Sequence, residues 1–324
     1  MKVRDPVILD CDTGIDDALA ILYLAGSGAD IVAAGSVHGN IEADLAAANT
    51  LRVLELAGRD DVPVAVGARR PLAQALETAG WVHGDDGLGN TNQPPPRGRV
   101  GQESAAEQLT RLARERPGEL SVLATGPLTN LALALLLEPL LPALVRRVVV
   151  MGGAVTHPGN ATPHAEANIQ HDPEAAELVF TAGWDVTMVG LDATMSVLLE
   201  GAWLQELETS ATRIGRFATS ILSHYLDLHC HWLGVRACPL HDPMAAAVLL
   251  DPELAVERRL PIHVELRGER TRGATLADLR PELPRYASDP GPAVRVVTAV
   301  DGDRFRRRFL DALLRPGVRP SREE

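Results

Sequence analysis

Aromatic residues and lysine are both scarce in this chain of 324 residues. Aromatics make up 3% of the sequence, so the 46% that is hydrophobic must build a mainly aliphatic core. Lys2 is the one lysine, and the formal net charge is −12. Because such a charge repels polyanions and anionic membranes at long range, neither nucleic acid nor a membrane is expected as a partner. A small neutral molecule is a better candidate for the substrate.

Cysteine is rare as well, and long apolar runs are missing. Cys11, Cys230 and Cys238 are odd in number and lack the paired spacing of zinc ligands, so free thiols in a reducing compartment are expected. No run of about 18 apolar residues exists that could form a transmembrane helix. The chain starts a strand almost at once, without the pattern of a secretory leader. We therefore expect a cytoplasmic protein.

Short apolar runs alternate with helical patterns along the chain. The runs lack polar alternation, as is typical of strands buried on both faces, and cover 6–10, 31–36, 62–66, 120–124, 148–151 and 186–191. Helices are predicted over 16–25, 41–57, 128–138 and 173–182, with Gly26 and Gly58 placed to end the first two. This alternation predicts an α/β fold with an open, mainly parallel, Rossmann-like sheet and helices on both faces. Residues 1–314 are predicted to form a single domain, and 315–324 a flexible tail.

Polar residues follow the ends of the predicted strands. In chain order they are Asp10, Asp12, Asn40, Thr125 and Asp192. In open parallel sheets, ligands bind at the carboxyl ends of the strands, so we expect the active site at this edge. Two long segments rich in Gly, Pro, Asn and His, 80–101 and 152–170, are expected to be functional loops.

An acidic cluster follows the first strand, where Asp10, Asp12, Asp16 and Asp17 lie within eight residues. Two unit charges 4 Å apart repel by about 4 kcal/mol at an effective dielectric constant of about 20. A helix N-terminus offsets only about 0.3–1 kcal/mol per carboxylate. A divalent cation would compensate the charge, and all-oxygen ligands favour Ca²⁺ or Mg²⁺. The alternative, in which two of the aspartates cap the helix and two face solvent, is disfavoured by the apolar strand that leads into the cluster.

The pattern Asp10-x-Asp12-x-x-x-Asp16-Asp17 resembles the signature of the inosine–uridine nucleoside hydrolases. Further motifs of that family follow in the family's order over nearly the whole chain: Val37–Asn40, Ala124–Asn130, Val149–Gly153, Gly159–Thr162, Glu166–Ile169, Asp172–Ala176 and His241–Pro243. The resemblance implies an enzyme of nucleoside catabolism or salvage that hydrolyses the N-glycosidic bond of ribonucleosides and releases ribose and free base. It also implies one Ca²⁺ per subunit and a homo-oligomer, either a tetramer or a dimer.

The resemblance assigns a role to individual residues. The metal ligands that it implies are the side chains of Asp12, Asp17 and Asp242 and the backbone carbonyl of Thr125. Asp10 would support the cluster, either directly at the metal or one layer behind it. Asp12 is implied as the general base for the attacking water, and His241 as the acid that protonates the leaving base. The implied substrate-binding residues are Asp16, Asn40, His83, Asn160, Glu166 and Asn168.

The chain departs from the family at several positions. Thr13 stands where Pro is usual, a change that should affect the rigidity of the turn more than the chemistry. In 228–232, family members often place tyrosines beside the base; His229 or His231 could substitute there, but an ordinary place on a helix face is favoured. Preference for purine or pyrimidine therefore stays open. Gln170 and His171 replace more apolar residues, and the sequence offers no functional reason for them.

Two other functions fit parts of the sequence. A magnesium-dependent phosphatase of the haloacid-dehalogenase type also begins with Asp-x-Asp after a strand, and Asp10 would be its nucleophile. Such enzymes usually hold the phosphate with a lysine, whereas Lys2 precedes the first strand. A non-catalytic protein that binds nucleosides or ribose could use calcium structurally, but His241 would then have no role. The nucleoside hydrolase is the favoured hypothesis.

Overall fold

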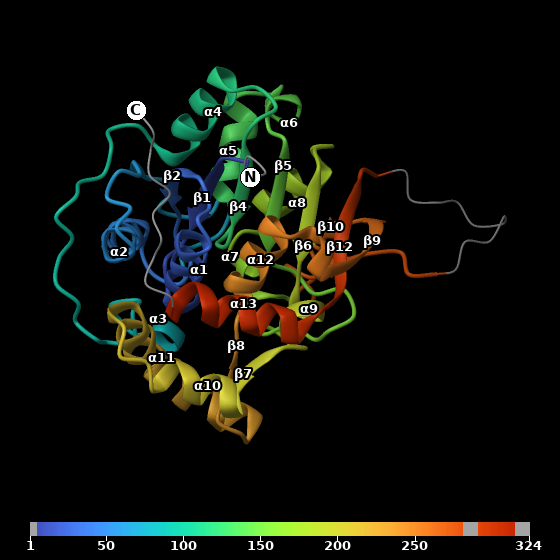
Figure 1. The fold of residues 1–324 in the computed structure, drawn as a ribbon. Coiled ribbons are helices and arrows are strands. Elements are labelled where there is room, and N and C mark those ends of the chain that lie inside the picture. The colour runs from blue at the N-terminus through green and yellow to red at the C-terminus, as the bar shows by residue number, and fades with distance from the viewer. Residues whose placement is uncertain (1–4, 281–290, 315–324) are drawn as a thin grey trace.

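A central sheet with helices on both faces forms the body of the computed structural model, which describes residues 5–280 and 291–314 (Figure 1). In these residues eight strands form one sheet in the order β3-β2-β1-β4-β5-β6-β12-β9. Their bounds are β1 Val7–Cys11, β2 Ile31–Ser36, β3 Val64–Val66, β4 Ser121–Ala124, β5 Arg147–Met151, β6 Val186–Val189, β9 Ala255–Pro261 and β12 Ala293–Val300. Two small sheets pair β7 (Leu198–Glu200) with β8 (Ala237–Pro239) and β10 (His263–Val264) with β11 (Thr275–Leu276).

The large sheet is parallel except at one edge. Neighbouring strands from β3 through β12 run parallel, and β9 pairs with β12 in the antiparallel direction. The central strand β1 is buried along its whole length, which explains why its residues show no polar alternation. The predicted mainly parallel α/β sheet is thereby confirmed. The carboxyl ends of β1, β2, β4 and β5 meet at one edge, and the candidate site lies there.

Two hydrophobic cores fill the space between the sheet and its helices. One lies under α1 Ile15–Gly26, α2 Ala43–Leu56, α10 Gly201–Glu208, α11 Arg213–Leu233, α12 His241–Leu250 and α13 Gly302–Leu314. The other lies under α4 Ala105–Glu115, α5 Thr129–Leu137, α6 Leu141–Leu144 and α8 Pro173–Thr181. Shorter elements are α3 Gly80–His83, α7 Ala167–His171, α9 Leu191–Thr194 and the 3₁₀ turn Pro252–Leu254. Within the described ranges, no helix combines the length and the apolar character needed to span a membrane.

Some element ends differ from the prediction. Helix α1 continues through Gly26, which was predicted to end it, and its C-cap is Ser27. A Cβ on Gly26 would meet the Ala312 carbonyl oxygen at 2.1 Å, so glycine at this position permits close contact with α13. Gly58 does follow the end of α2 with φ 71°, as predicted. The strand predicted over 186–191 ends early because Leu191 begins α9. The predicted tail, 315–324, lies outside the described residues.

Candidate active site

The turn between β1 and α1 presents the first carboxylates. Asp12 follows the end of β1, and Asp16 and Asp17 lie in the first turn of α1. Asp17 caps this helix, since its Oδ2 accepts a hydrogen bond from the Gly14 amide at 2.9 Å. Gly14 is required for close approach: an added Cβ would meet Nδ1 of His83 at 2.5 Å. The short connection therefore holds three aspartates at the carboxyl edge of the sheet.

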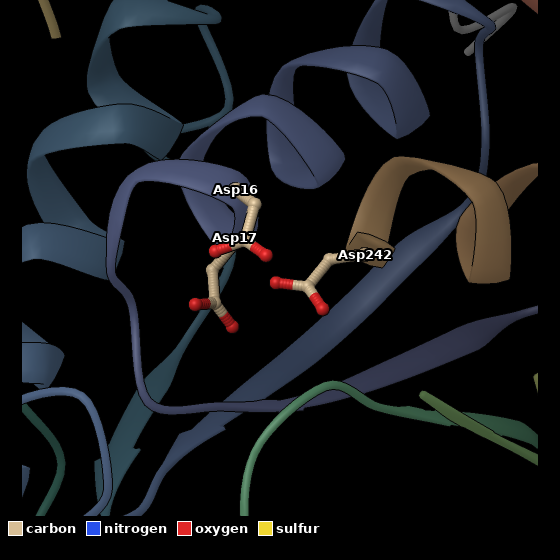
Figure 2. A group of neighbouring side chains, drawn as sticks. All are labelled: Asp16, Asp17 and Asp242. Carbon is tan, nitrogen blue, oxygen red and sulfur yellow. The ribbon is translucent and has the colours of Figure 1, made fainter. Parts of the chain in front are cut away.

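Two of these aspartates meet a third from a distant part of the chain. Figure 2 shows Asp16 and Asp17, at the start of α1, facing Asp242 at the start of α12. One carboxylate oxygen from each residue lies within 4.8 Å of the other two, and all three residues are buried. Oδ1 of Asp16 is a buried atom without a hydrogen-bond partner. Burial and the charge of Asp17 raise the pKa of Asp16 to about 8. Burial and the neighbouring carboxylates raise the pKa of Asp242 well above its usual range.

No cationic side chain balances this cluster within the described part of the chain. The one ion-pair partner there is His83, whose Nδ1 lies 3.9 Å from Oδ1 of Asp16. Burial and the neighbouring histidines lower the pKa of His83 to about 3, so the ring is neutral near pH 7. The unpartnered Asp16 oxygen and the all-oxygen donor set fit a hard divalent cation such as Ca²⁺ or Mg²⁺.

Asn40 joins Asp12 to this cluster. Its amide N donates to Oδ2 of Asp12 at 2.7 Å, and its Nδ2 donates to Oδ1 of Asp12 at 3.2 Å and to Oδ2 of Asp17 at 3.1 Å. Gly39, with φ 152°, permits this approach, because a Cβ there would meet Oδ2 of Asp12 at 2.1 Å. Asp12, the predicted base and ligand, is completely buried, and burial and the charges of Asp17 and Asp16 raise the pKa of its carboxylate well above the usual range.

Asp10 is held by a separate contact from α5. Its Oδ1 accepts a hydrogen bond from Nδ2 of Asn130 at 2.6 Å, and its Oδ2 is buried without a partner. Burial raises the pKa of Asp10 to about 7, against the lowering effect of the Asn130 hydrogen bond. Asn130 also donates to the Ser36 carbonyl at 2.8 Å and accepts from the Ala68 amide at 2.8 Å. The sequence motif contained Asn130 but indicated no role for it.

Thr125 and the segment before α7 add further polar groups. The Thr125 hydroxyl donates to Oδ1 of Asp17 at 2.7 Å, and the Thr125 carbonyl accepts from Nδ2 of Asn168 at 2.8 Å. Glu166 is the N-cap of α7 and accepts hydrogen bonds from the amides of Asn168, Ile169 and Gly153 at 3.0, 3.2 and 3.0 Å. Asn160 is exposed, and its Oδ1 accepts from the Ala167 amide at 2.9 Å. Asn168 therefore contacts the Thr125 carbonyl and Glu166 holds the start of α7, whereas Asn160 lies on the surface.

Asp192 has a different task from the other polar residues at strand ends. Its carboxylate accepts hydrogen bonds from the amides of Val155, Thr156 and His157 at 2.8, 2.7 and 3.1 Å. It therefore organises the loop after β5 and is not one of the three clustered carboxylates.

Three buried histidines come from three different helices. His83 ends α3, and its Nδ1 accepts a hydrogen bond from the Ile15 amide at 3.1 Å. His241 begins α12, and its Nδ1 lies 2.7 Å from the Thr194 hydroxyl. Burial is the main cause that lowers the pKa of His241 to about 3. His229 lies in α11 and is buried, whereas its neighbour His231 is exposed, as expected for an ordinary helix-face residue.

Aromatic rings connect two of these histidines, His83 and His229, to the surface. Centroid distances are 5.8 Å between His83 and Tyr225, 4.1 Å between Tyr225 and His229, and 5.3 Å between His229 and Trp232. Trp232 in turn lies 5.7 Å from Trp81, and both tryptophans are exposed. Sequence reasoning missed Tyr225, although its position four residues before His229 places both on one face of a helix.

A buried hydrogen-bond chain supports the loop that carries Asn40. The Thr129 hydroxyl donates to Oδ2 of Asp172 at 2.7 Å, and Nε2 of His38 lies 3.0 Å from the same hydroxyl. Because the hydroxyl proton is directed to Asp172, the Thr129 oxygen accepts the proton of the His38 ring. Asp172 also accepts from the Leu72 amide at 3.0 Å. This chain ties the loop after β2 to the starts of α5 and α8.

The sequence and the fold both have counterparts among known proteins. A family described as "Inosine-uridine preferring nucleoside hydrolase" matches residues 7–307. "Probable uridine nucleosidase 2" of Arabidopsis thaliana is 38% identical over 318 residues, which cover 96% of this chain and 98% of that protein. "Inosine-uridine preferring nucleoside hydrolase" of Crithidia fasciculata is 37% identical over 314 residues, covering 96% and 98%.

Solved structures agree with these relatives. A plant nucleoside hydrolase has a TM-score of 0.92 at 35% identity, with 96% of this chain and 99% of that chain covered. A purine-preferring ribonucleoside hydrolase from Gardnerella vaginalis has a TM-score of 0.88 at 32% identity, with 95% and 98% covered.

Proposed function

This chain belongs to the inosine-uridine preferring nucleoside hydrolase family, and from that premise we propose that it cleaves ribonucleosides into ribose and free base with one bound Ca²⁺. The observation that carries the metal proposal is the buried group of Asp16, Asp17 and Asp242, whose negative charge no cation among the described residues balances. Relatives are described as uridine nucleosidases and as inosine-uridine preferring hydrolases, so uridine and inosine are the first substrates to test.

We assign the ion to the side chains of Asp12, Asp17 and Asp242 and to the Thr125 carbonyl. When bound, Ca²⁺ supplies positive charge that acidifies a nearby water and orients it. The hydrogen bonds of Asn40 and of the Thr125 hydroxyl hold the carboxylates of Asp12 and Asp17 in place before the ion arrives. Calcium accepts six to eight oxygen ligands, which leaves room for ribose hydroxyls and water beside the four protein ligands.

Asp12 is proposed as the general base. Its two oxygens are oriented by the amide and the side chain of Asn40, and burial and the charges of Asp17 and Asp16 raise the pKa of its carboxylate. Hydrolysis of a glycosidic bond builds positive charge on the sugar, so a ring of carboxylate and amide oxygens stabilises the transition state more than the ground state. Asp10 remains behind as a support, held by Asn130.

The ribose hydroxyls are proposed to bind Asp16, Asn40, Asn160, Glu166 and Asn168. Oδ1 of Asp16 has no partner and is available for a hydroxyl donor. Nδ2 of Asn168 is committed to the carbonyls of Thr125 and Met151, so its Oδ1 is the atom left for the sugar. Asn160 lies at the surface, and its contribution requires that the sugar reach the loop after β5.

His241 is proposed as the acid that assists the leaving base, with His83 beside the base. If the Thr194 hydroxyl donates to Nδ1 of His241, the neutral ring carries its proton on Nε2 and can donate a hydrogen bond to a base nitrogen on which negative charge develops. General acid catalysis of this kind contributes about 10²–10⁴-fold.

The position of Asp10 argues against the phosphatase alternative. A phosphatase of that type needs Asp10 as an accessible nucleophile, but one oxygen is held by Asn130 and the other is a buried atom. A phosphate could not approach either oxygen without displacing protein groups.

Two further properties are proposed from the surface and the cysteines. An apolar patch of Leu136, Leu137 and Leu140, which are 65%, 53% and 69% exposed, is consistent with a homo-oligomer, either a tetramer or a dimer. The three cysteines are free thiols, consistent with a cytoplasmic location.

Kinetics of two variants test the catalytic roles. Asp12→Asn should abolish ribose release from inosine, uridine and 4-nitrophenyl riboside, because all three need an activated water. His241→Ala should lower kcat on inosine by about 10²-fold while sparing 4-nitrophenyl riboside, whose leaving group needs no proton. His231→Ala removes an exposed histidine and is the matched control. Equal losses of kcat on inosine and on 4-nitrophenyl riboside in His241→Ala would refute the role of His241. An Asp12→Asn variant that still releases ribose would refute the assignment of Asp12 as the general base.

A further inference from the structure

The buried histidines of the site share one arrangement. Nδ1 of His83, His229 and His241 is within hydrogen-bond distance of a protein group: the Ile15 amide, the Tyr225 carbonyl and the Thr194 hydroxyl. In the described residues no hydrogen bond involves Nε2 of any of the three rings, and none of these Nε2 atoms is a buried, unpartnered atom. Each ring is therefore anchored at one nitrogen and leaves the other for a ligand.

The partners determine where two of the rings carry their proton. The Tyr225 carbonyl can only accept, so Nδ1 of His229, at 2.8 Å, is the protonated nitrogen. The Ile15 amide can only donate, so Nδ1 of His83, at 3.1 Å, is unprotonated. Burial lowers the pKa of His229, which keeps the ring neutral. In the neutral rings, Nε2 of His229 is an acceptor and Nε2 of His83 is a donor.

The row of rings extends from the carboxylate cluster outwards. His83 lies next to Asp16, Tyr225 next to His83, and His229 next to Tyr225, at the distances given above. Helices α3 and α11, which carry these rings, lie in contact (Figure 1). The row leads away from Asp16, at which the ribose is proposed to bind, and its flat rings favour a flat ligand.

We propose that His229 selects the base by accepting a hydrogen bond from a ring N–H through Nε2. This proposal rests on the proposed function, since it concerns the base of the same substrate. The favoured substrates carry an N–H on the base edge, as N3 of uracil does. Cytosine carries a lone pair at N3, which faces the lone pair of the imidazole and is disfavoured. The sequence left His229 as an ordinary helix residue, and the anchored Nδ1 with a free Nε2 distinguishes it from that role.

Substitutions of His229 separate base selection from packing. Asn places its amide nitrogen near the position of Nδ1, so His229→Asn retains the contact with the Tyr225 carbonyl and removes Nε2. Gln reaches the position of Nε2, so His229→Gln restores an acceptor. His231→Asn, on the exposed face of the same helix, is the matched control.

The measurement is kcat/KM for three substrates: uridine, which carries N3–H; cytidine, which lacks it; and 3-methyluridine, in which a methyl group replaces it. In the wild type, kcat/KM for uridine should exceed the values for cytidine and for 3-methyluridine. His229→Asn should reduce the uridine/cytidine and uridine/3-methyluridine ratios of kcat/KM by about 3- to 10-fold, the effect of one hydrogen bond. His229→Gln and His231→Asn should retain these ratios. Equal losses on all three substrates, or unchanged ratios in His229→Asn, would overturn the proposal. A wild type that releases no ribose from any nucleoside would instead refute the proposed function, so the two failures are distinguishable.

Discussion

The Thr129→Val substitution would test the buried chain that supports the loop of Asn40. Val has nearly the shape of Thr but lacks the hydroxyl. The substitution removes the hydrogen bond to Oδ2 of Asp172 at 2.7 Å and the contact with Nε2 of His38 at 3.0 Å. Nδ1 of His38 already lacks a partner, so the buried ring would lose its last side-chain hydrogen bond.

The size of the effect follows from these contacts. A neutral hydrogen bond contributes about 0.5–1.5 kcal/mol and one to a charged group about 1.5–3 kcal/mol. Asp172 retains the hydrogen bonds that it accepts from the amides of Leu72 and Ala175, so the substitution removes only part of the hydrogen bonding of its carboxylate. We therefore expect the free energy of unfolding to fall by about 2–4 kcal/mol.

The assay is urea unfolding followed by circular dichroism, with Thr110→Val as the matched control. Thr110 is also buried in a helix, but its hydroxyl donates only to the Ala106 carbonyl of its own helix at 2.7 Å. Thr110→Val should therefore change the free energy of unfolding by less than about 1 kcal/mol. Thr129→Ser should restore most of the loss. Equal effects of Thr129→Val and Thr110→Val would refute the reasoning.

Two more predictions concern the histidines. Burial lowers the pKa of His38 to about 4 in the folded chain, against about 6.5 in the unfolded chain, so between these values the unfolded chain binds more protons. Wild-type stability relative to His38→Gln should therefore decline as the pH falls from 6.5 to 5, by about 1.4 kcal/mol per unit, and a constant difference in chemical denaturation would contradict this. Gly14→Ala should lower both kcat and stability, by about 1–3 kcal/mol in unfolding free energy, because the new Cβ meets His83; wild-type values would contradict the packing.

Much of the fold could be predicted from the sequence because its signals are local. Apolar runs without alternation predict buried parallel strands, and all of the predicted strands are present: 31–36 with the predicted bounds and the others with shifted ends. Gly26 misled the prediction because its absence of a side chain serves a contact with α13 and not the end of a helix. A contact between the first and last helices leaves no local trace in the sequence.

Part of the carboxylate cluster could also be predicted, although Asp12 was the expected ligand and the structure groups Asp16 with Asp17 and Asp242. The run from Asp10 to Asp17 and the His241–Asp242 pair are motifs, and the structure brings Asp16, Asp17 and Asp242 together. Their meeting depends on the packing of α1 against α12, 225 residues apart by the numbering of Asp17 and Asp242. The roles of Thr129 and Tyr225 could not be predicted, because each acts through partners from other elements. A tautomer such as that of His229 depends on one backbone carbonyl and becomes visible only in the structure.

The most direct test of the account is a calcium titration of protein dialysed against EDTA, with ribose release from inosine and uridine measured beside equilibrium binding of Ca²⁺. We expect no release without metal and recovery that saturates as one Ca²⁺ binds per chain. Asp242→Asn should weaken that binding and shift the recovery to higher Ca²⁺. Full activity after exhaustive chelation, or calcium binding that leaves the rate unchanged, would contradict the account.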